Sequence, residues 1–134
     1  MKVIVCVDDG LGMAFNRRRQ SRDRVLCEDL VKDLDGETRA IAPDSLTLFD
    51  GTEAKLLVCD APLSSSAKVA FVENPPLLPY KYEIDEMVIY RWNRKYPADR
   101  YLDLLPMEHG FSLTERREFC GSSHEKITKE VYRK

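Results

Sequence analysis

A short apolar run near the start of the chain restricts the possible folds more than any other feature. Residues 3–7 read Val-Ile-Val-Cys-Val, and a brief, mostly β-branched apolar segment is typical of a strand buried on both faces. Gly10 and Gly12 follow, and such residues allow a loop to turn sharply over a pocket. A helical pattern begins after Ser21. This order of strand, loop and helix predicts an α/β chain whose first strand lies inside the sheet.

The helix has a clear apolar stripe and one acid at its start. Ser21 is a favoured N-cap residue, and Asp35-Gly36 is a typical helix end. Asp23 precedes the stripe at helical spacing, so we expect it at the pocket end of the buried face. An aspartate in the first turn also interacts favourably with the helix dipole without any ligand, so both roles stay open. The stripe consists of Leu26, Cys27, Leu30, Val31 and Leu34.

Strands dominate the second half of the chain. The proline-rich segment 74–79 cannot be regular helix or central strand and is predicted to be a rigid loop. With 134 residues, no repeat and no linker, we expect one domain over 1–134. The alternation predicts an α/β sheet, mostly parallel, with an antiparallel tail. Strands are predicted at 39–42, 55–59 (of buried type), 69–72, 87–92 and, at an edge, 101–105, with a short helical turn at 46–49.

The first 23 residues resemble the start of dihydrofolate reductase. There, a first strand runs into a mobile loop of the type Asp-x-x-x-Gly-Met/Ile-x-x-Asn, and a helix presents one buried acid to the pterin ring. The matching residues here are Asp8, Gly12, Met13, Asn16 and Asp23. The resemblance implies a dihydrofolate-reductase-like fold with a small-ligand site between this loop, the helix and the strand 87–92. The candidate ligand-binding residues are Asp23, Val5, Met13, Asn16 and Arg91.

The end of the chain carries conflicting signals. Residues 122–125 read Ser-Ser-His-Glu, which is a capping box and favours a helix over the last segment. Dihydrofolate reductases instead close with an antiparallel pair, in which a Ser-His precedes a strand of the Phe-Glu-x-x-x-Arg-Arg kind. Residues 125–133 resemble that ending. Because local propensity is weak evidence, we predict strands over 111–119 and 127–132.

Both cofactor motifs of that family are replaced. The reductases hold a nicotinamide dinucleotide with Gly-Arg-x-Thr at a helix start and with Gly-Gly after a strand. The matching places here read Pro-Asp-Ser-Leu (43–46) and Glu-Asn-Pro-Pro (73–76). Asp44 and Glu73 would repel phosphate, and Pro75 offers no amide donor. We therefore predict a non-reductase relative that binds a small ligand near Asp23 without NADPH, any other cofactor or a metal.

The same replacement leads to a backbone prediction. In the reductases the Gly-Gly peptide bond is cis, which a non-proline bond resists by about 2.5–4 kcal/mol and an X-Pro bond by only about 0.5–1 kcal/mol. Two prolines stand where the glycines are lost. We predict that Asn74–Pro75 or Pro75–Pro76 is cis.

An alternative function comes from basic residues. A run of four arginines beside a helix start forms a candidate site for phosphate or an RNA backbone, and residues 91–101 interleave basic and aromatic side chains, as single-strand binders do. The run could equally be a solvated loop paired with neighbouring acids. A third possibility is a structural or partner-binding module. The arginines of the run are Arg17, Arg18, Arg19 and Arg22.

A second resemblance concerns small bacterial proteins labelled ribonuclease Z. Residues 15–24 and 121–128 resemble them closely, which keeps a metal-independent ribonuclease among the alternatives. True ribonuclease Z is a metallo-β-lactamase-fold enzyme with a His-x-His-x-Asp-His zinc cluster. His109 and His124 are the only histidines and cannot supply that cluster. We expect His124 to be a surface or capping residue.

Composition excludes several classes. The net charge of −2 gives no general attraction to nucleic acid or acidic lipid. The five apolar residues after Met1-Lys2 are too few for a signal peptide or a membrane span, so we expect a cytoplasmic protein. Four cysteines without CxxC spacing predict reduced, buried thiols rather than zinc ligands or disulfides.

Overall fold

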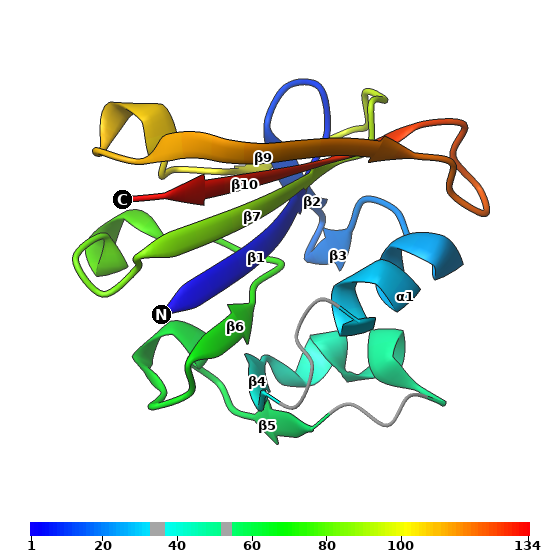
Figure 1. Ribbon diagram of the computed structural model, residues 1–134. Coiled ribbons are helices and arrows are strands. Elements are labelled where there is room, and N and C mark those ends of the chain that lie inside the picture. The colour runs from blue at the N-terminus through cyan, green and yellow to red at the C-terminus, as the bar shows by residue number, and fades with distance from the viewer. Residues whose placement is uncertain (33–36, 52–54) are drawn as a thin grey trace.

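One mixed sheet forms the centre of the molecule (Figure 1). A computed structural model describes residues 1–32, 37–51 and 55–134. The sheet has seven strands in the order β5-β4-β6-β1-β7-β10-β9. The first five run parallel, β10 pairs antiparallel with β7, and β9 pairs antiparallel with β10. The predicted α/β sheet with an antiparallel tail is confirmed. The strands are β1 (Lys2–Val7), β4 (Arg39–Ile41), β5 (Leu56–Val58), β6 (Val69–Phe71), β7 (Glu86–Arg91), β9 (Ser112–Phe119) and β10 (Ile127–Arg133).

Strand β1 lies inside this sheet and divides the core in two. Val3, Val5 and Val7 are buried in one apolar cluster, whereas Ile4 is buried in another, because successive side chains of a strand point to opposite faces. The second cluster includes Leu26 and Leu30 of helix α1 (Arg24–Lys32). The helix is therefore held by its predicted apolar stripe. Leu34 and the predicted helix end at Asp35–Gly36 lie outside the described residues.

The segment after β1 is a hairpin where only a loop was predicted. Strands β2 (Gly12–Phe15) and β3 (Arg18–Arg19) pair antiparallel. Between them, Asn16 and Arg17 have φ angles of 51° and 62°, the left-handed pair that two-residue hairpin turns require and that asparagine tolerates. Strand β8 (Arg100–Tyr101) pairs with β2. The predicted edge strand 101–105 is thus shorter, and it belongs to this second sheet.

Other expectations need smaller corrections. Strand β5 is not buried, since Leu57 and Val58 are 40% and 44% exposed at the edge of the sheet. The helical turn predicted at 46–49 belongs to a 3-10 helix over Pro43–Phe49. The capping box at 122–125 does not begin a helix, and β10 is a strand as predicted. Because β10 pairs with both β7 and β9, sheet pairing overrides the local signal.

The proline-rich loop has the predicted backbone feature. The Pro75–Pro76 peptide bond is cis, one of the two bonds predicted to be so. The loop then forms a 3-10 turn over Leu78–Tyr80.

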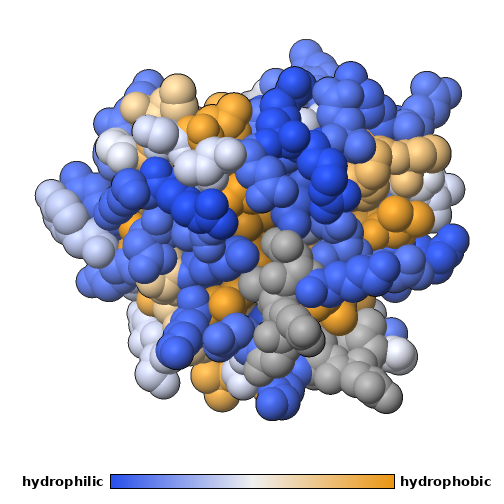
Figure 2. Space-filling model, in the orientation of Figure 1, coloured by the Kyte–Doolittle hydropathy of each residue, from blue (hydrophilic) through white to orange (hydrophobic). Residues whose placement is uncertain are grey.

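The surface and the ends of the chain complete the description. Figure 2 shows one face as mainly hydrophilic, with apolar residues in small separate groups. In the view of Figure 1, both chain ends lie at the left, where β1 begins and β10 ends. Helix α1 and strand β3 lie at the right, toward which β1 and β7 point. In the described part of the chain, no helix combines the length and the apolar character needed to span a bilayer.

Candidate functional site

The carboxylate of Asp23 is the centre of a buried hydrogen-bonded assembly. Asp23 is 1% exposed. Its Oδ1 accepts hydrogen bonds from the amides of Val25 and Leu26, at 2.9 and 3.2 Å, and its main-chain oxygen accepts one from Cys27. This geometry defines an N-cap. Asp23 therefore caps α1, and the predicted N-cap role of Ser21 is wrong.

The same carboxylate holds the loop before β10. The Ser122 amide donates to Oδ1 at 3.0 Å, and the Ser123 amide and hydroxyl donate to Oδ2 at 2.9 and 3.2 Å. His124 Nδ1 lies 2.9 Å from Oδ2. With the two cap bonds, each oxygen has three partners. Burial alone would raise the pKa of Asp23, but the bonds from Ser122, Ser123 and His124 hold that pKa well below its usual value, so the side chain is a carboxylate.

Gly121 allows this loop to come close. A Cβ at Gly121 would lie 2.4 Å from Asp23 Oδ2 and 2.8 Å from Ile127 Cδ1. The main-chain oxygen of His124 accepts a hydrogen bond from the Gly121 amide at 2.9 Å. The absence of a side chain at 121 is thus what lets the loop wrap around the carboxylate.

His124 is buried, which corrects the expectation of a surface or capping residue. It is 4% exposed, and its ring stacks on Trp92 with 4.6 Å between centroids and 28° between planes. Its Nε2 lies 3.0 Å from Ser21 Oγ and 2.9 Å from the Tyr96 hydroxyl. Both ring nitrogens therefore have polar partners, and the ring is fixed in place.

A second aspartate anchors the hairpin to the sheet. The Oδ1 of Asp8 accepts hydrogen bonds from the amides of Gly10 and Gly12, at 2.9 and 2.7 Å. Its Oδ2 accepts from the Tyr96 amide and from Gln20, each at 3.1 Å. Burial opposes the charge, but these bonds lower the pKa of Asp8. Asp8 therefore connects β1, the hairpin and the segment before β8 at the edge of the site.

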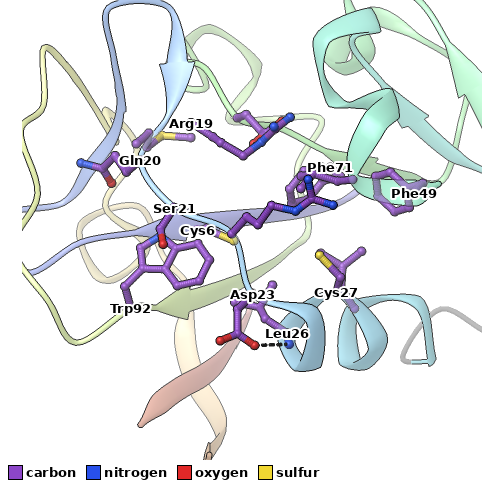
Figure 3. A pocket seen from close by; sticks show the side chains of 15 residues that line it. Cys6, Arg19, Gln20, Ser21, Asp23, Leu26, Cys27, Phe49, Phe71 and Trp92 are labelled. Carbon is purple, nitrogen blue, oxygen red and sulfur yellow. Dashed lines mark hydrogen bonds and ion pairs between the residues drawn. The ribbon is translucent and has the colours of Figure 1, made fainter. Parts of the chain in front are cut away.

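A small cavity lies between α1 and the sheet, next to this assembly. Its volume is about 30 Å³, room for about two water molecules and too little for a ring system without movement. Figure 3 shows Ser21 and Trp92 on one side of it and Phe49 and Phe71 on the other. The remaining lining residues are Cys6, Met13, Arg19, Gln20, Arg22, Asp23, Leu26, Cys27, Leu30, Leu48 and Glu73.

A larger polar cleft adjoins the cavity and shares Arg19, Phe71 and Glu73 with it. Its volume is about 640 Å³, in the range of small-molecule sites. The cleft lies beyond the carboxyl ends of β4 and β6, where open α/β sheets bind ligands. Its other lining residues are Arg17, Arg18, Ala42, Asp44, Ser45, Asp60, Ala61, Pro62, Leu63, Val72, Asn74, Pro75, Pro76 and Tyr80.

An ion pair stands where the cavity meets the cleft. Arg19 Nε and one terminal nitrogen donate to the two oxygens of Glu73 at 2.8 and 3.1 Å, a bidentate arrangement. The Ser45 hydroxyl also donates to Glu73, at 2.6 Å, and Arg19 donates to the Asp44 carbonyl at 2.8 Å. Arg19 thus links β3 to the first turn of the 3-10 helix and lies between the cavity and the cleft.

The two cavity cysteines are free thiols. Burial raises the pKa of the Cys6 thiol well above its usual value, and the negative charge of Glu73 adds to the rise. Burial also raises the pKa of Cys27, so both remain protonated and weakly nucleophilic. All four cysteines are free, as predicted, but Cys6, Cys27 and Cys59 are only partly buried and Cys120 is exposed.

The predicted ligand-binding residues are only partly brought together. Asp23 and Met13 line the cavity. Val5 is buried in the core, Asn16 lies in the hairpin turn and donates its amide to Asp99, and Arg91 pairs with Glu130 at 2.6 Å.

The four arginines of the basic run are divided by the hairpin. Arg17 and Arg18 line the cleft, Arg22 lines the cavity, and Arg19 lines both. Ser21, Trp92 and Tyr96 were not predicted as neighbours of His124. No local pattern connects residues so far apart in the chain.

Comparison with known proteins supports the fold and leaves the chemistry open. No protein-family model matches the chain, and no curated protein does. A solved structure of dihydrofolate reductase from Enterococcus faecalis, complexed with NADP(H) and RAB-propyl, matches with a TM-score of 0.71. The match covers 98% of this chain and 94% of that chain at 6% identity. The chain therefore has a dihydrofolate-reductase-like fold. The resemblance to proteins labelled ribonuclease Z gains no such support, and the described residues contain no cluster of three metal-ligating side chains.

Proposed function

We propose that this protein binds a small neutral or zwitterionic molecule in the cavity and the adjoining cleft, and does not use a nicotinamide dinucleotide. The observation that carries the proposal is the shared wall of Arg19, Phe71 and Glu73. It connects an apolar cavity to a cleft of about 640 Å³. Binding sites of small molecules combine such apolar surface with a few polar groups.

The charges around the cleft favour this class of ligand. Each phosphate of a dinucleotide would meet carboxylates as well as guanidinium groups, and Pro75 and Pro76 present no amide donors. A neutral or zwitterionic molecule can use both signs at short range. The charged lining residues are three arginines and three acids, namely Arg17, Arg18, Arg19, Asp44, Asp60 and Glu73.

The polar contacts to such a ligand are supplied by Arg19 and Glu73. Asp23, the residue expected to hydrogen-bond an amino-heterocycle, already has three hydrogen-bond donors at each carboxylate oxygen. If the bidentate bond between Arg19 and Glu73 opens, a carboxylate and a guanidinium become available at the cavity mouth. Opening also enlarges a cavity that is otherwise too small for a ring. The ion pair is then both the entrance and the recognition element.

The single tryptophan makes the proposal testable. Trp92 lines the cavity, so its fluorescence should respond to occupancy. Amino-heterocycles, nucleosides, amino acids and NADPH are titrated separately. We expect saturable quenching by at least one neutral or zwitterionic compound, weakened about tenfold or more in Glu73→Gln through loss of a charged hydrogen bond. The exposed Glu37→Gln is the matched control. Saturation by NADPH at low micromolar concentration, or by no compound, contradicts the proposal.

A second candidate function has one structural observation in its favour. Pairing of β2 with β8 brings the arginine run and the second basic-aromatic segment onto one small sheet, where Phe15 and Tyr101 are 48% and 52% exposed. Exposed aromatic rings beside arginines can stack on bases of single-stranded RNA.

The RNA alternative makes a distinct prediction about salt. Anisotropy of a labelled single-stranded RNA should show binding that weakens steeply with salt, with a slope lowered by about one unit in Arg18→Ala. Arg116→Ala, on the distant strand β9, should leave the slope unchanged. Binding that ignores salt, or its absence at every salt concentration, removes this alternative.

A further inference from the structure

Three side chains at the cavity form a hydrogen-bonded chain from a hydroxyl to a carboxylate. Ser21 Oγ lies 3.0 Å from His124 Nε2, and His124 Nδ1 lies 2.9 Å from Asp23 Oδ2. Both distances fall in the range of about 2.6–3.2 Å that proton transfer through a general base requires. We propose that Ser21 is a nucleophile, with His124 as its general base and Asp23 as the positioning residue, and that the site transfers the acyl group of small carboxylic esters.

The protein fixes the tautomer that this role needs. Asp23 is a carboxylate held by backbone amides of Ser122 and Ser123, so its Oδ2 accepts a hydrogen bond from Nδ1–H of His124. The lone pair of Nε2 then faces Ser21. Stacking on Trp92 prevents the imidazole from tilting away. A fixed ring between a buried acid and a hydroxyl is the arrangement that activates serine nucleophiles on unrelated folds.

Ser21 is more exposed than the two residues that activate it. Asp23 and His124 are 1% and 4% exposed, whereas Ser21 is half-buried and lines the cavity. Arg19 and Arg22 line the same cavity. Because Arg19 is paired with Glu73, the guanidinium of Arg22 is the charge that favours the oxyanion formed during acyl transfer. The cavity volume of about 30 Å³ restricts the acyl group to a short one such as acetyl.

The Tyr96 hydroxyl is a second neighbour of the base. It lies 2.9 Å from His124 Nε2 and 3.4 Å from Ser21 Oγ. When it donates to Ser21, the serine proton remains directed at Nε2. The three groups can therefore form one continuous chain of donors toward the imidazole.

The reaction is balanced without any further reagent. Ser21 Oγ bonds to the ester carbonyl carbon while its proton passes to His124 Nε2. The tetrahedral intermediate then breaks its bond to the leaving oxygen, which takes the proton from Nε2 as an alcohol. Water, deprotonated by the same nitrogen, attacks the acyl-serine and releases the carboxylic acid and the free hydroxyl. One ester and one water yield one acid and one alcohol.

Covalent labelling of the full chain tests the proposal. Methanesulfonyl fluoride, whose reacting group is about as small as acetyl, sulfonylates activated serines, and intact mass with peptide mapping locates the adduct. We expect one adduct per chain, on Ser21, formed at least about 100-fold faster than in the urea-unfolded chain. Ser66→Ala, at an exposed position, should label normally. No adduct, an adduct elsewhere, or the same rate in the unfolded chain overturns the proposal.

Turnover of methyl acetate, followed by the acid that it releases, provides the second measurement. Ser21→Ala should lower its hydrolysis at least about tenfold, and Ser66→Ala should not. Asp23→Asn, assayed per folded molecule, should lower kcat with KM unchanged, because a positioning residue acts through His124. Unchanged turnover in Ser21→Ala overturns the proposal.

This inference rests on the proposed function only in that the ester must enter the same cavity. Labelling does not require the cleft ligand, so failure of labelling leaves the fluorescence titration valid. Conversely, if no ligand changes Trp92 fluorescence, the labelling experiment still decides whether Ser21 is a nucleophile.

Discussion

Two polar assemblies lie at the same cavity and are held in opposite ways. Around Asp23, both carboxylate oxygens accept hydrogen bonds from main-chain amides, and Oδ2 is also bonded to the Ser123 hydroxyl and to His124. Around Glu73, the partners are the side chains of Arg19 and Ser45, at the edge of an open cleft. Amides fixed by a helix and a loop cannot move away singly, whereas side chains can change rotamer. The Asp23 carboxylate is therefore fixed in place, and Glu73 is where a ligand can exchange partners.

This contrast separates the chain from what its fold alone suggests. The acid at the start of the helix is engaged by a loop about 100 residues further along the chain. The charges of the cleft are mixed.

The largest expected effect comes from breaking the buried assembly. In Asp23→Asn the side-chain amide would face donors such as the Ser123 amide and His124. We expect a loss of about 2–4 kcal/mol in the free energy of unfolding, since a buried group loses its partner. Urea unfolding followed by Trp92 fluorescence measures it. The matched change Asp60→Asn, at an exposed position in the cleft, should stay within about 0.5 kcal/mol. Equal losses in the two variants would refute the contrast.

Lowering the pH should remove the difference in unfolding free energy between wild type and Asp23→Asn. Because the folded pKa of Asp23 lies below its usual value, the unfolded chain binds its proton first as the pH falls. The stability that Asp23 contributes is complete above about pH 4, the ordinary aspartate pKa, and is lost progressively below it. The gap in unfolding free energy between wild type and Asp23→Asn should therefore narrow from pH 5 to pH 2. A gap that widens on acidification would contradict this sign.

Adding a side chain at Gly121, next to the Asp23 carboxylate, should lower the stability by an intermediate amount. A Cβ at Gly121 would overlap Asp23 Oδ2, so Gly121→Ala should cost about 1–3 kcal/mol, as overpacking usually does. At Gly10 the nearest atom would be 3.7 Å from a new Cβ, and Gly10→Ala should be tolerated. Thermal unfolding of both variants measures this difference. A stable Gly121→Ala would show that the loop does not wrap tightly around Asp23.

The smallest effect is expected at the cleft. Glu73→Gln keeps one hydrogen-bond acceptor for Arg19 and Ser45, and the pair is partly exposed. We expect a loss of about 1 kcal/mol or less in the free energy of unfolding. Urea unfolding of Glu73→Gln and Asp23→Asn under the same conditions shows which assembly contributes more to the free energy of unfolding. If Glu73→Gln proved the more destabilising change, the ion pair could not be the part that opens.

The sequence predicted the parts of the fold that have local patterns. Apolar runs marked β1, β4, β6 and β7 to within a residue or two at either end, because burial on both faces leaves a compositional trace. Strand β10 was instead predicted from the family resemblance, against a local helix signal. The I′ turn at Asn16 had a recognisable signal, since asparagine is favoured there, but the interpretation as a mobile loop concealed it.

The site was less predictable, for a physical reason. Asp23 and His124 are joined across the whole domain, and hydrogen bonds between such distant residues leave no spacing to detect. A histidine next to two serines looks the same in a sequence whether it is exposed or buried. The exposure of β5 was also missed, since a short apolar strand looks alike at the edge and the centre of a sheet.

The most direct test of the account is the ionisation of one side chain. Carbon-detected NMR follows the Asp23 carboxyl resonance in the intact protein as the pH is lowered. If main-chain amides and His124 hold the carboxylate, its resonance should keep the ionised position at pH values well below the ordinary aspartate pKa of about 3.9. A resonance that titrates near pH 4 or above would mean that those bonds are not formed. Asp23 would then be a free carboxylate available to a ligand, and the central claim would be wrong.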